Sequence, residues 1–193
     1  MDNCVRIYDG VMTDEKCQYF VDKFEAHPEM QELQNNSHGK TLTMMSLMDN
    51  PDGHHFSFKE DLIFLNDMFM ENVEKYKKDL DLKSYQFPNE FGIEAFKIKR
   101  YLPNTTDEFP AHIDVHNYAQ ARRFLIMFVY LTDDVAGQTE LEMASPYGLF
   151  DMISSPCRRG SILMFPPMWP WVHAGKAPAE NSKYIIGSYL HYI

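Results

Sequence analysis

The stretch FPAHIDVHNY, residues 109–118, places His112 and Asp114 two residues apart, with His116 two residues further on. If this stretch forms a β-strand, His112 and Asp114 project from the same face, because side chains alternate along a strand. The chain has 8 His and 28 acidic residues in 193, so about one His-x-Asp or His-x-Glu pair is expected by chance. The stretch therefore predicts either part of a metal site or a polar strand face, and residues elsewhere must decide.

A second pair of this kind, His27 and Glu29, lies at the end of a predicted helix over residues 13–27. The helix is predicted by apolar residues at i, i+3, i+4 and i+7, namely Cys17, Phe20, Val21 and Phe24. Because the residue before a proline avoids the helical region, Pro28 ends this helix. We therefore expect His27 and Glu29 not to share a face, which leaves His112-x-Asp114 as the better candidate.

Beyond this first helix, the chain divides into a helical part and a strand-rich part. Residues 30–57 are polar and predict a long loop, of a kind that often serves as a lid. A second helix is expected over residues 59–80, where apolar residues step by threes and fours. From residue 91 onward, short apolar or alternating runs are separated by Pro, Gly, Asn and Asp, which is typical of strands. We expect an α+β fold whose mainly β core is a sandwich or barrel. The expected bounds are a single domain over 1–193, with a helical flank and lid loop over 1–90 and the core over 91–193.

Composition narrows the classes of partner and compartment. The formal net charge of −10 disfavours a nucleic-acid partner, which requires a positive surface. Two basic clusters, residues 97–100 and 122–123, flank or enter predicted strands and are interpreted as solvated strand faces. The sequence has no run of about 18 apolar residues that would predict a membrane span, and its start lacks the pattern of a secretory signal. The three scattered cysteines favour a reducing setting, so we expect a cytoplasmic protein.

The best third ligand is His173, which follows the apolar and aromatic run FPPMWPWV, residues 165–172. Three ligands along one straight strand, as His116 would require, diverge over about 13 Å and do not converge on one ion. Two imidazoles and one carboxylate form the facial set suited to non-haem Fe(II), with open positions for substrate and oxygen. The alternative is a structural His173 that caps a turn against the aromatic run.

Lys183, ten residues after His173, completes a pattern that resembles the Fe(II)- and 2-oxoglutarate-dependent oxygenases, specifically their prolyl-4-hydroxylase-like branch. In order, that branch has a Tyr, His-x-Asp, a distant His and then a Lys, which here are Tyr101, His112, Asp114, His173 and Lys183. Other segments that resemble the branch are VRIYDGVMTDEKCQYFVDKFE at 5–25, VYLTDDVAGQTEL at 129–141, RRGSILMFPPMWPWVHAG at 158–175 and KYIIGSYLHY at 183–192. Residues 30–90 match little, and Ala136-Gly137-Gln138 departs from the Gly-Gly-x-Thr turn of the branch.

The resemblance implies a double-stranded β-helix, or jelly roll, with N-terminal flanking helices. It implies 2-oxoglutarate as co-substrate, O2 as oxidant, ascorbate as a further candidate cofactor, and Fe(II) bound by His112, Asp114 and His173. The distal carboxylate of 2-oxoglutarate needs a buried cation and hydroxyl donors. The resemblance assigns these roles to Lys183, Tyr101 and Tyr130. For each tyrosine the alternative is an ordinary core aromatic, and Lys176 is the rival cation.

The implied activity is that of a 2-oxoglutarate-dependent dioxygenase that hydroxylates a C–H bond, with a prolyl residue in a peptide or protein as the leading substrate. Free amino acids or other small molecules are the alternative substrates. Nucleic-acid dealkylation predicts arginines after the distal histidine, and none follows Arg159. A non-enzymatic jelly-roll binding module would be favoured by a lost ligand or cation, and none is lost here. We expect a monomer or weak dimer with no membrane or nucleic-acid partner.

Overall fold

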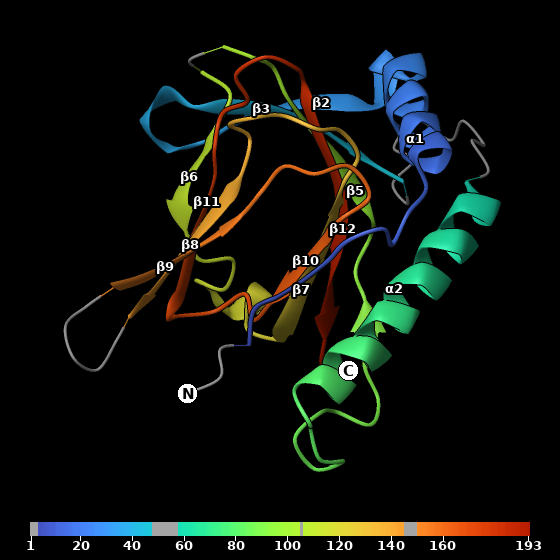
Figure 1. The fold of residues 1–193 in the computed structure, drawn as a ribbon, viewed down its shortest axis with the longest axis vertical. Coiled ribbons are helices and arrows are strands. Elements are labelled where there is room, and N and C mark those ends of the chain that lie inside the picture. The colour runs from blue at the N-terminus through green and yellow to red at the C-terminus, as the bar shows by residue number, and fades with distance from the viewer. Residues whose placement is uncertain (1–3, 48–57, 105, 145–149) are drawn as a thin grey trace.

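Two antiparallel sheets face each other, and two helices cover the outer face of the larger sheet (Figure 1). The computed structural model describes residues 4–47, 58–104, 106–144 and 150–193. In sheet order, the larger sheet contains β1 (Arg6–Tyr8), β10 (Ile162–Phe165), β7 (Arg123–Tyr130), β12 (Lys183–His191), β5 (Lys97–Tyr101), β3 (Thr41–Ser46) and β2 (Gln31–Asn35), with β4 (Gly92–Ile93) paired to β12. The smaller sheet contains β6 (Phe109–His112), β11 (Trp171–Gly175), β8 (Thr139–Ala144) and β9 (Phe150–Ser155). This arrangement confirms the predicted jelly-roll core.

Strand β7 shows how the core is divided between the two faces of the larger sheet. Its sequence RFLIMFVY is almost continuously apolar, as expected of a strand that is buried on both faces. The outer set packs with the helices and consists of Leu125, Met127 and Val129. The inner set packs toward the smaller sheet and consists of Ile126, Phe128 and Tyr130. Strand alternation therefore sends half of each central strand into the space between the sheets.

Helices α1 (Asp14–Ala26) and α2 (Lys59–Asp79) lie where their apolar patterns predict them. The Thr13 side chain caps α1 by accepting a hydrogen bond from the Lys16 backbone N–H. The apolar faces of both helices join the outer core cluster against the larger sheet (Figure 1). None of the helices in the described part of the chain is long and apolar enough to cross a membrane.

The loop predicted over residues 30–57 is wrong for its first half. Residues 31–46 form the hairpin β2–β3, and β3 extends the larger sheet by pairing with β5. The turn between the two strands is Ser37–Gly39, where His38 and Gly39 have positive φ. Polar residues hid these strands, because β3 buries only Leu42 and Met45 of its six residues. His54 and His55, in the second half of the predicted loop, lie outside the described residues, and a surface position for them stays a prediction.

Candidate metal centre

His112, Asp114 and His173 converge between the two sheets. One ligand atom from each side chain lies within 4.8 Å of the other two, and no other group of three such residues occurs in the described chain. His112 ends β6 and is paired directly with His173 on β11, so the register of these strands brings the two rings to a centroid distance of 4.2 Å. The Asp114 carboxylate lies 3.5 Å from His112 Nε2 and 3.3 Å from His173 Nε2.

Asp114 reaches the cluster from a bend and not from a strand. Within the stretch 109–118 the strand ends at His112, so strand alternation does not align Asp114 with it. Instead, the Asp114 backbone N–H donates to the Pro167 carbonyl at 2.9 Å, which fixes the bend against the segment before β11. His116 lies further along, exposed and outside the cluster, as expected.

Both imidazoles are oriented by backbone carbonyls. His112 Nδ1 lies 2.7 Å from the Pro110 carbonyl, and His173 Nδ1 lies 3.2 Å from the Trp171 carbonyl. A carbonyl only accepts, so each Nδ1 carries a proton, and in the neutral ring Nε2 is left with a lone pair that can bind a metal. This arrangement of the outer partners is the one that metal-binding histidines use.

Asp114 is buried and remains ionised. Burial acts to raise its pKa, but the rings of His112 and His173, which can donate to the carboxylate and carry positive charge when Nε2 is protonated, outweigh this and hold the pKa well below its usual range. The Tyr189 hydroxyl donates to Asp114 Oδ1 at 2.9 Å. Asp114 Oδ2 and His112 Nε2 are buried atoms without a hydrogen-bond partner in the described chain. Unsatisfied buried atoms of this kind are costly, and a divalent cation bound by the three side chains would satisfy them.

The second His-x-Glu pair, His27 and Glu29, differs from its prediction. His27 Nδ1 lies 3.1 Å from Glu29 Oε1, so the two side chains do meet across the helix end. The pair is nevertheless not part of any cluster of three ligating groups among the described residues. His27 and Glu29 therefore form a local hydrogen-bonded pair and not a metal site.

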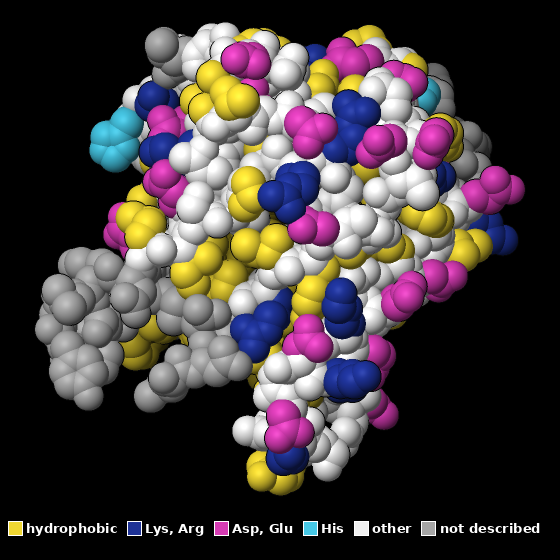
Figure 2. Space-filling view, viewed as in Figure 1, with side chains coloured by type: hydrophobic (Ala, Val, Ile, Leu, Met, Phe, Trp, Pro, Cys, Tyr) yellow, Lys and Arg dark blue, Asp and Glu magenta, His cyan; other side chains and the backbone are white. Residues whose placement is uncertain are grey.

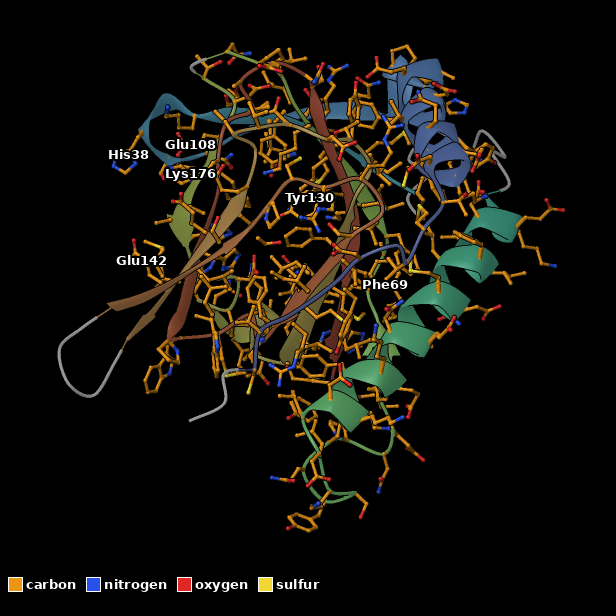
Figure 3. All side chains as sticks on the ribbon, in the orientation of Figure 1. His38, Phe69, Glu108, Tyr130, Glu142 and Lys176 are labelled. Carbon is orange, nitrogen blue, oxygen red and sulfur yellow. The ribbon has the colours of Figure 1, made fainter. Side chains whose placement is uncertain are left out.

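Lys183 is a buried cation without a carboxylate partner in the described chain. Its side chain is fully buried, and its Nζ donates only a long hydrogen bond, 3.4 Å, to the Lys176 carbonyl. Burial lowers the pKa of Lys183 to about 8. The rival cation Lys176 is already paired, because its Nζ lies 3.0 Å from Glu108 Oε1 (Figure 3). Lys183 is therefore the cation that is available to an incoming anion.

Tyr101 lies beside Lys183 on the neighbouring strand. The two residues are direct partners in the β5–β12 register, and Lys183 Nζ lies 4.7 Å from the centre of the Tyr101 ring. Burial raises the pKa of Tyr101 far above its usual value, so its hydroxyl stays protonated as a donor. Gly175 leaves space in front of both groups, because a Cβ there would stand 3.6 Å from Lys183 Nζ and from the Tyr101 hydroxyl.

Tyr130 also points between the sheets (Figure 3), but its hydroxyl has other partners. It lies 2.8 Å from Thr139 Oγ1 and 3.2 Å from the Ser155 carbonyl. Thr139 lines the cavity at the metal cluster, whereas Tyr130 does not. The structure thus places Tyr130 behind Thr139. Its contact with a cofactor stays a prediction.

A cavity of about 30 Å³ connects the metal cluster at one end with Lys183 and Tyr101 at the other. This space is smaller than 2-oxoglutarate, so binding requires side chains of the lining to move. Lys99, which also lines the cavity, is a long side chain without an ion pair in the described chain. Thr139 was not among the predicted site residues, and Lys99 was predicted only as part of the basic cluster 97–100. Thr139 stands in the quoted segment 129–141, and Lys99 lies two residues before Tyr101, on the same strand face.

Comparison with known proteins gives a fold but no family match by sequence. No family model and no curated protein matches the chain. Among solved structures, a viral collagen prolyl hydroxylase from Paramecium bursaria Chlorella virus-1, solved with 2OG, has 14% sequence identity and a TM-score of 0.63. The alignment covers 99% of this chain and 97% of that one. A prolyl hydroxylase from Trichoplax adhaerens, in complex with a hypoxia-inducible factor peptide fragment, has 13% identity and a TM-score of 0.73, over 98% of this chain and 84% of that one.

This chain has the prolyl hydroxylase fold. A 2OG-Fe(II) oxygenase family oxidoreductase from Burkholderia pseudomallei agrees, with 13% identity and a TM-score of 0.66 over 97% of this chain and 84% of that one. The prolyl hydroxylase likeness confirms the resemblance on which the expected jelly roll rested. Because the identities are low, the likeness establishes architecture, and the chemistry must be argued from the residues of this chain.

Proposed function

We propose that the protein is an Fe(II)- and 2-oxoglutarate-dependent dioxygenase that hydroxylates a C–H bond. The supporting observation is the combination of two features in one cavity of this fold. One is a buried cluster of two imidazoles and a carboxylate, and the other is the buried, unpaired ammonium group of Lys183. A structural core needs neither, since an unpaired buried cation costs stability.

His112 Nε2, the Asp114 carboxylate and His173 Nε2 would hold Fe(II) and leave three positions open. When bound, Fe(II) and 2-oxoglutarate supply the oxidation: O2 is reduced, one oxygen atom enters the C–H bond, and 2-oxoglutarate leaves as succinate and CO2. The Tyr189 hydroxyl and the two backbone carbonyls keep the ligands oriented. These contacts hold the three donors in place before the metal arrives.

At the other end of the cavity, Lys183 would receive the distal carboxylate of 2-oxoglutarate, with the Tyr101 hydroxyl as a second donor. A charge-assisted contact of this kind is about twice as strong as a neutral hydrogen bond. Ile126, Phe128 and Ile185 line the same cavity and belong to the inner apolar cluster. The residues thus provide a polar contact at each end and an apolar wall between them.

For the substrate, the leading candidate is a prolyl residue in a peptide or protein. Two of the proteins that share the fold are prolyl hydroxylases, and one of these is in complex with a peptide fragment. A free amino acid or another small molecule is the second candidate. The non-enzymatic binding module remains the alternative to catalysis, and iron binding separates it from an oxygenase.

The decisive test is anaerobic addition of Fe(II) and then 2-oxoglutarate, with detection of the visible metal-to-ligand charge-transfer band. We expect a band in the wild type, no band in His173→Ala, and a band in Lys183→Met that needs far more 2-oxoglutarate. Lys78→Met, an exposed lysine on α2, is the matched control and should behave as the wild type. If no band forms and Fe(II) binding is insensitive to His173→Ala and Asp114→Ala, the oxygenase proposal is refuted.

A further inference from the structure

A second, larger cavity of about 130 Å³ lies next to the metal centre. Its lining shares Lys99, Ile126, Phe128 and Ile185 with the smaller cavity, so the two spaces are neighbours across these side chains. Of the remaining lining residues, the proposed chemistry uses only Tyr189, whose hydroxyl orients Asp114. Its volume is close to that of a cavity that accommodates one benzene molecule, and so suits a single amino-acid side chain.

Two unpaired lysines line this cavity because of the alternation of β5. Lys97 and Lys99 lie on the face of β5 that also carries Tyr101, whereas Ile98 and Arg100 lie on the opposite face. Within the described residues neither ammonium group forms an ion pair or hydrogen bond, and Lys99 Nζ only lies over the Phe109 ring at 5.1 Å. Both lysines are half-buried on the inner face of β5, so the part of the predicted basic strand face that they form borders this cavity.

The arginine of the cavity already has its partner. Arg123 Nε and Nη2 each donate to the Glu94 carboxylate at 2.8 Å, and the guanidinium lies 3.9 Å from the Tyr189 ring. Glu94 is thus unavailable to Lys97 or Lys99. Three cations and one carboxylate line the cavity, which leaves two positive charges in excess.

The excess of positive charge in the larger cavity contrasts with the rest of the molecule. The chain has a formal net charge of −10, and on the face drawn in Figure 2 basic side chains are interspersed with acidic ones. A concave site lined by one sign of charge concentrates ligands of the opposite sign. Positive charge placed beside the metal cluster is therefore a feature of this cavity and not of the overall composition.

We propose that this cavity binds a carboxylate of the substrate through Lys97 and Lys99, so that the enzyme acts on a residue or molecule next to an acidic group. The inference rests on the proposed oxygenase function and names the substrate class. The cavity volume of about 130 Å³, which suits a single amino-acid side chain, favours the carboxylate of an acidic residue over a larger phosphate ester. The carboxylate can come from an acidic side chain in a peptide or from a free acid.

The electrostatics of Lys99 support this assignment. Burial lowers the pKa of Lys99, and the positive charges of Lys97 and Arg123 lower it further, against an opposing effect of Asp114. A bound carboxylate would relieve this repulsion. The same carboxylate would also draw Lys99 toward the larger cavity and away from the space that 2-oxoglutarate must enter.

The test compares matched ligands and matched variants. The first set of ligands is a series of short peptides, acetylated and amidated at their ends, that contain one proline. In each peptide one of the two positions before or the two positions after the proline is Glu, Gln or Lys. The second set is free glutamate, aspartate and proline. Binding to the Mn(II)- and 2-oxoglutarate-loaded protein is measured by calorimetry, and hydroxylation by mass spectrometry with Fe(II). The variants are Lys97→Met, Lys99→Met and Lys99→Glu, with Lys78→Met on α2 as the control for loss of an exposed lysine. The charge-transfer band with 2-oxoglutarate is recorded for every variant.

We expect at least one Glu peptide to bind about tenfold more tightly than its Gln counterpart. This preference should fall to about twofold or less in Lys99→Met and turn toward the Lys peptide in Lys99→Glu, while Lys78→Met keeps it. Free acids that bind with the same dependence on Lys99, when no peptide does, would support the carboxylate site and move the substrate from peptide to small molecule.

Two results would overturn the inference while the oxygenase proposal stands. One is a normal band with no preference for acidic ligands at any position in either arm. The other is a Lys99→Met variant that needs far more 2-oxoglutarate for its band, because Lys99 would then serve the co-substrate. Loss of the band in the wild type would instead refute the proposed function itself.

Discussion

Replacement of Lys183 by methionine should make the ligand-free protein more stable. Lys183 is fully buried and has no carboxylate partner in the described chain, and burial lowers its pKa from 10.5 to about 8. At about 1.4 kcal/mol per pH unit, this corresponds to a cost of about 3 kcal/mol for keeping the ammonium charged in the folded state at pH 7. Methionine keeps an unbranched apolar stem and removes the charge. We expect the free energy of unfolding to rise by about 1–3 kcal/mol.

The assay is urea unfolding at several pH values, followed by circular dichroism. Between pH 8 and 10.5 the unfolded chain binds a proton at Lys183 that the folded chain does not. Wild-type stability should therefore rise through this window. The advantage of Lys183→Met should be full below pH 8 and gone by pH 10.5. The exposed control Lys78→Met should change stability by less than about 0.5 kcal/mol at any pH.

Added ligand should narrow or reverse the stability difference between the two proteins. With Mn(II) bound, 2-oxoglutarate at 100 times its dissociation constant should stabilise the wild type by about 2.7 kcal/mol, and should stabilise Lys183→Met far less at the same concentration. A ligand-free Lys183→Met that is clearly less stable than the wild type would refute the reasoning. It would show that the ammonium group has a stabilising partner, and Lys183 would then not be an unpaired cation available to bind an anion.

Three further predictions follow from the same geometry. Above pH 8, 2-oxoglutarate binding must bring a proton to Lys183, so its dissociation constant, measured by titration of the charge-transfer band, should rise about tenfold per pH unit. Gly175→Val should prevent 2-oxoglutarate binding but not metal binding, because the valine side chain would occupy the space in front of Lys183 and Tyr101. Calorimetric titration with Mn(II), and then with 2-oxoglutarate, measures the two binding steps separately. Asp134 accepts five backbone N–H groups, from residues 136–137 and 179–181, so Asp134→Ala should lower the free energy of unfolding by about 2–3 kcal/mol in urea titrations. Burial opposes its ionisation, yet these hydrogen bonds hold the pKa of Asp134 well below its usual range, so its contribution should be lost as the pH falls below 3.8.

The helices and strands with a clear pattern of apolar residues could be predicted from the sequence. The 13-residue helix α1 shows its buried face at threes and fours, and β7 is a nearly unbroken apolar run. The hairpin β2–β3 could not be predicted, because its strands bury few side chains and gain their stability from pairing with β5. The local hydrophobic pattern does not indicate that a strand pairs at the edge of a sheet.

The candidate site was predictable in its residue types more than in its geometry. Spacing brought out His112, Asp114, His173 and Lys183, but the assumed strand alternation between the first two does not exist. The alignment arises from the pairing of His112 with His173 and from a backbone hydrogen bond to Asp114, both of which join distant segments. Tertiary contacts of this kind leave no trace in a short stretch of sequence.

The register of β5 against β12 links the co-substrate end of the site to the proposed substrate end. Tyr101 and Lys99 are paired with Lys183 and Ile185 respectively, and Lys97 is paired with Gly187. The inner face of these two paired strands therefore carries positive charge at two places. One is Lys183, and the other is formed by Lys97 and Lys99. A slip by one residue would turn Ile98 and Arg100 inward and move the lysines to the helix side. Ile98 packs against the helices, and Arg100 forms an ion pair with Glu25 of α1 at 2.8 Å, so the outer face opposes such a slip. The packing that stabilises the fold thereby also fixes where both anions would bind.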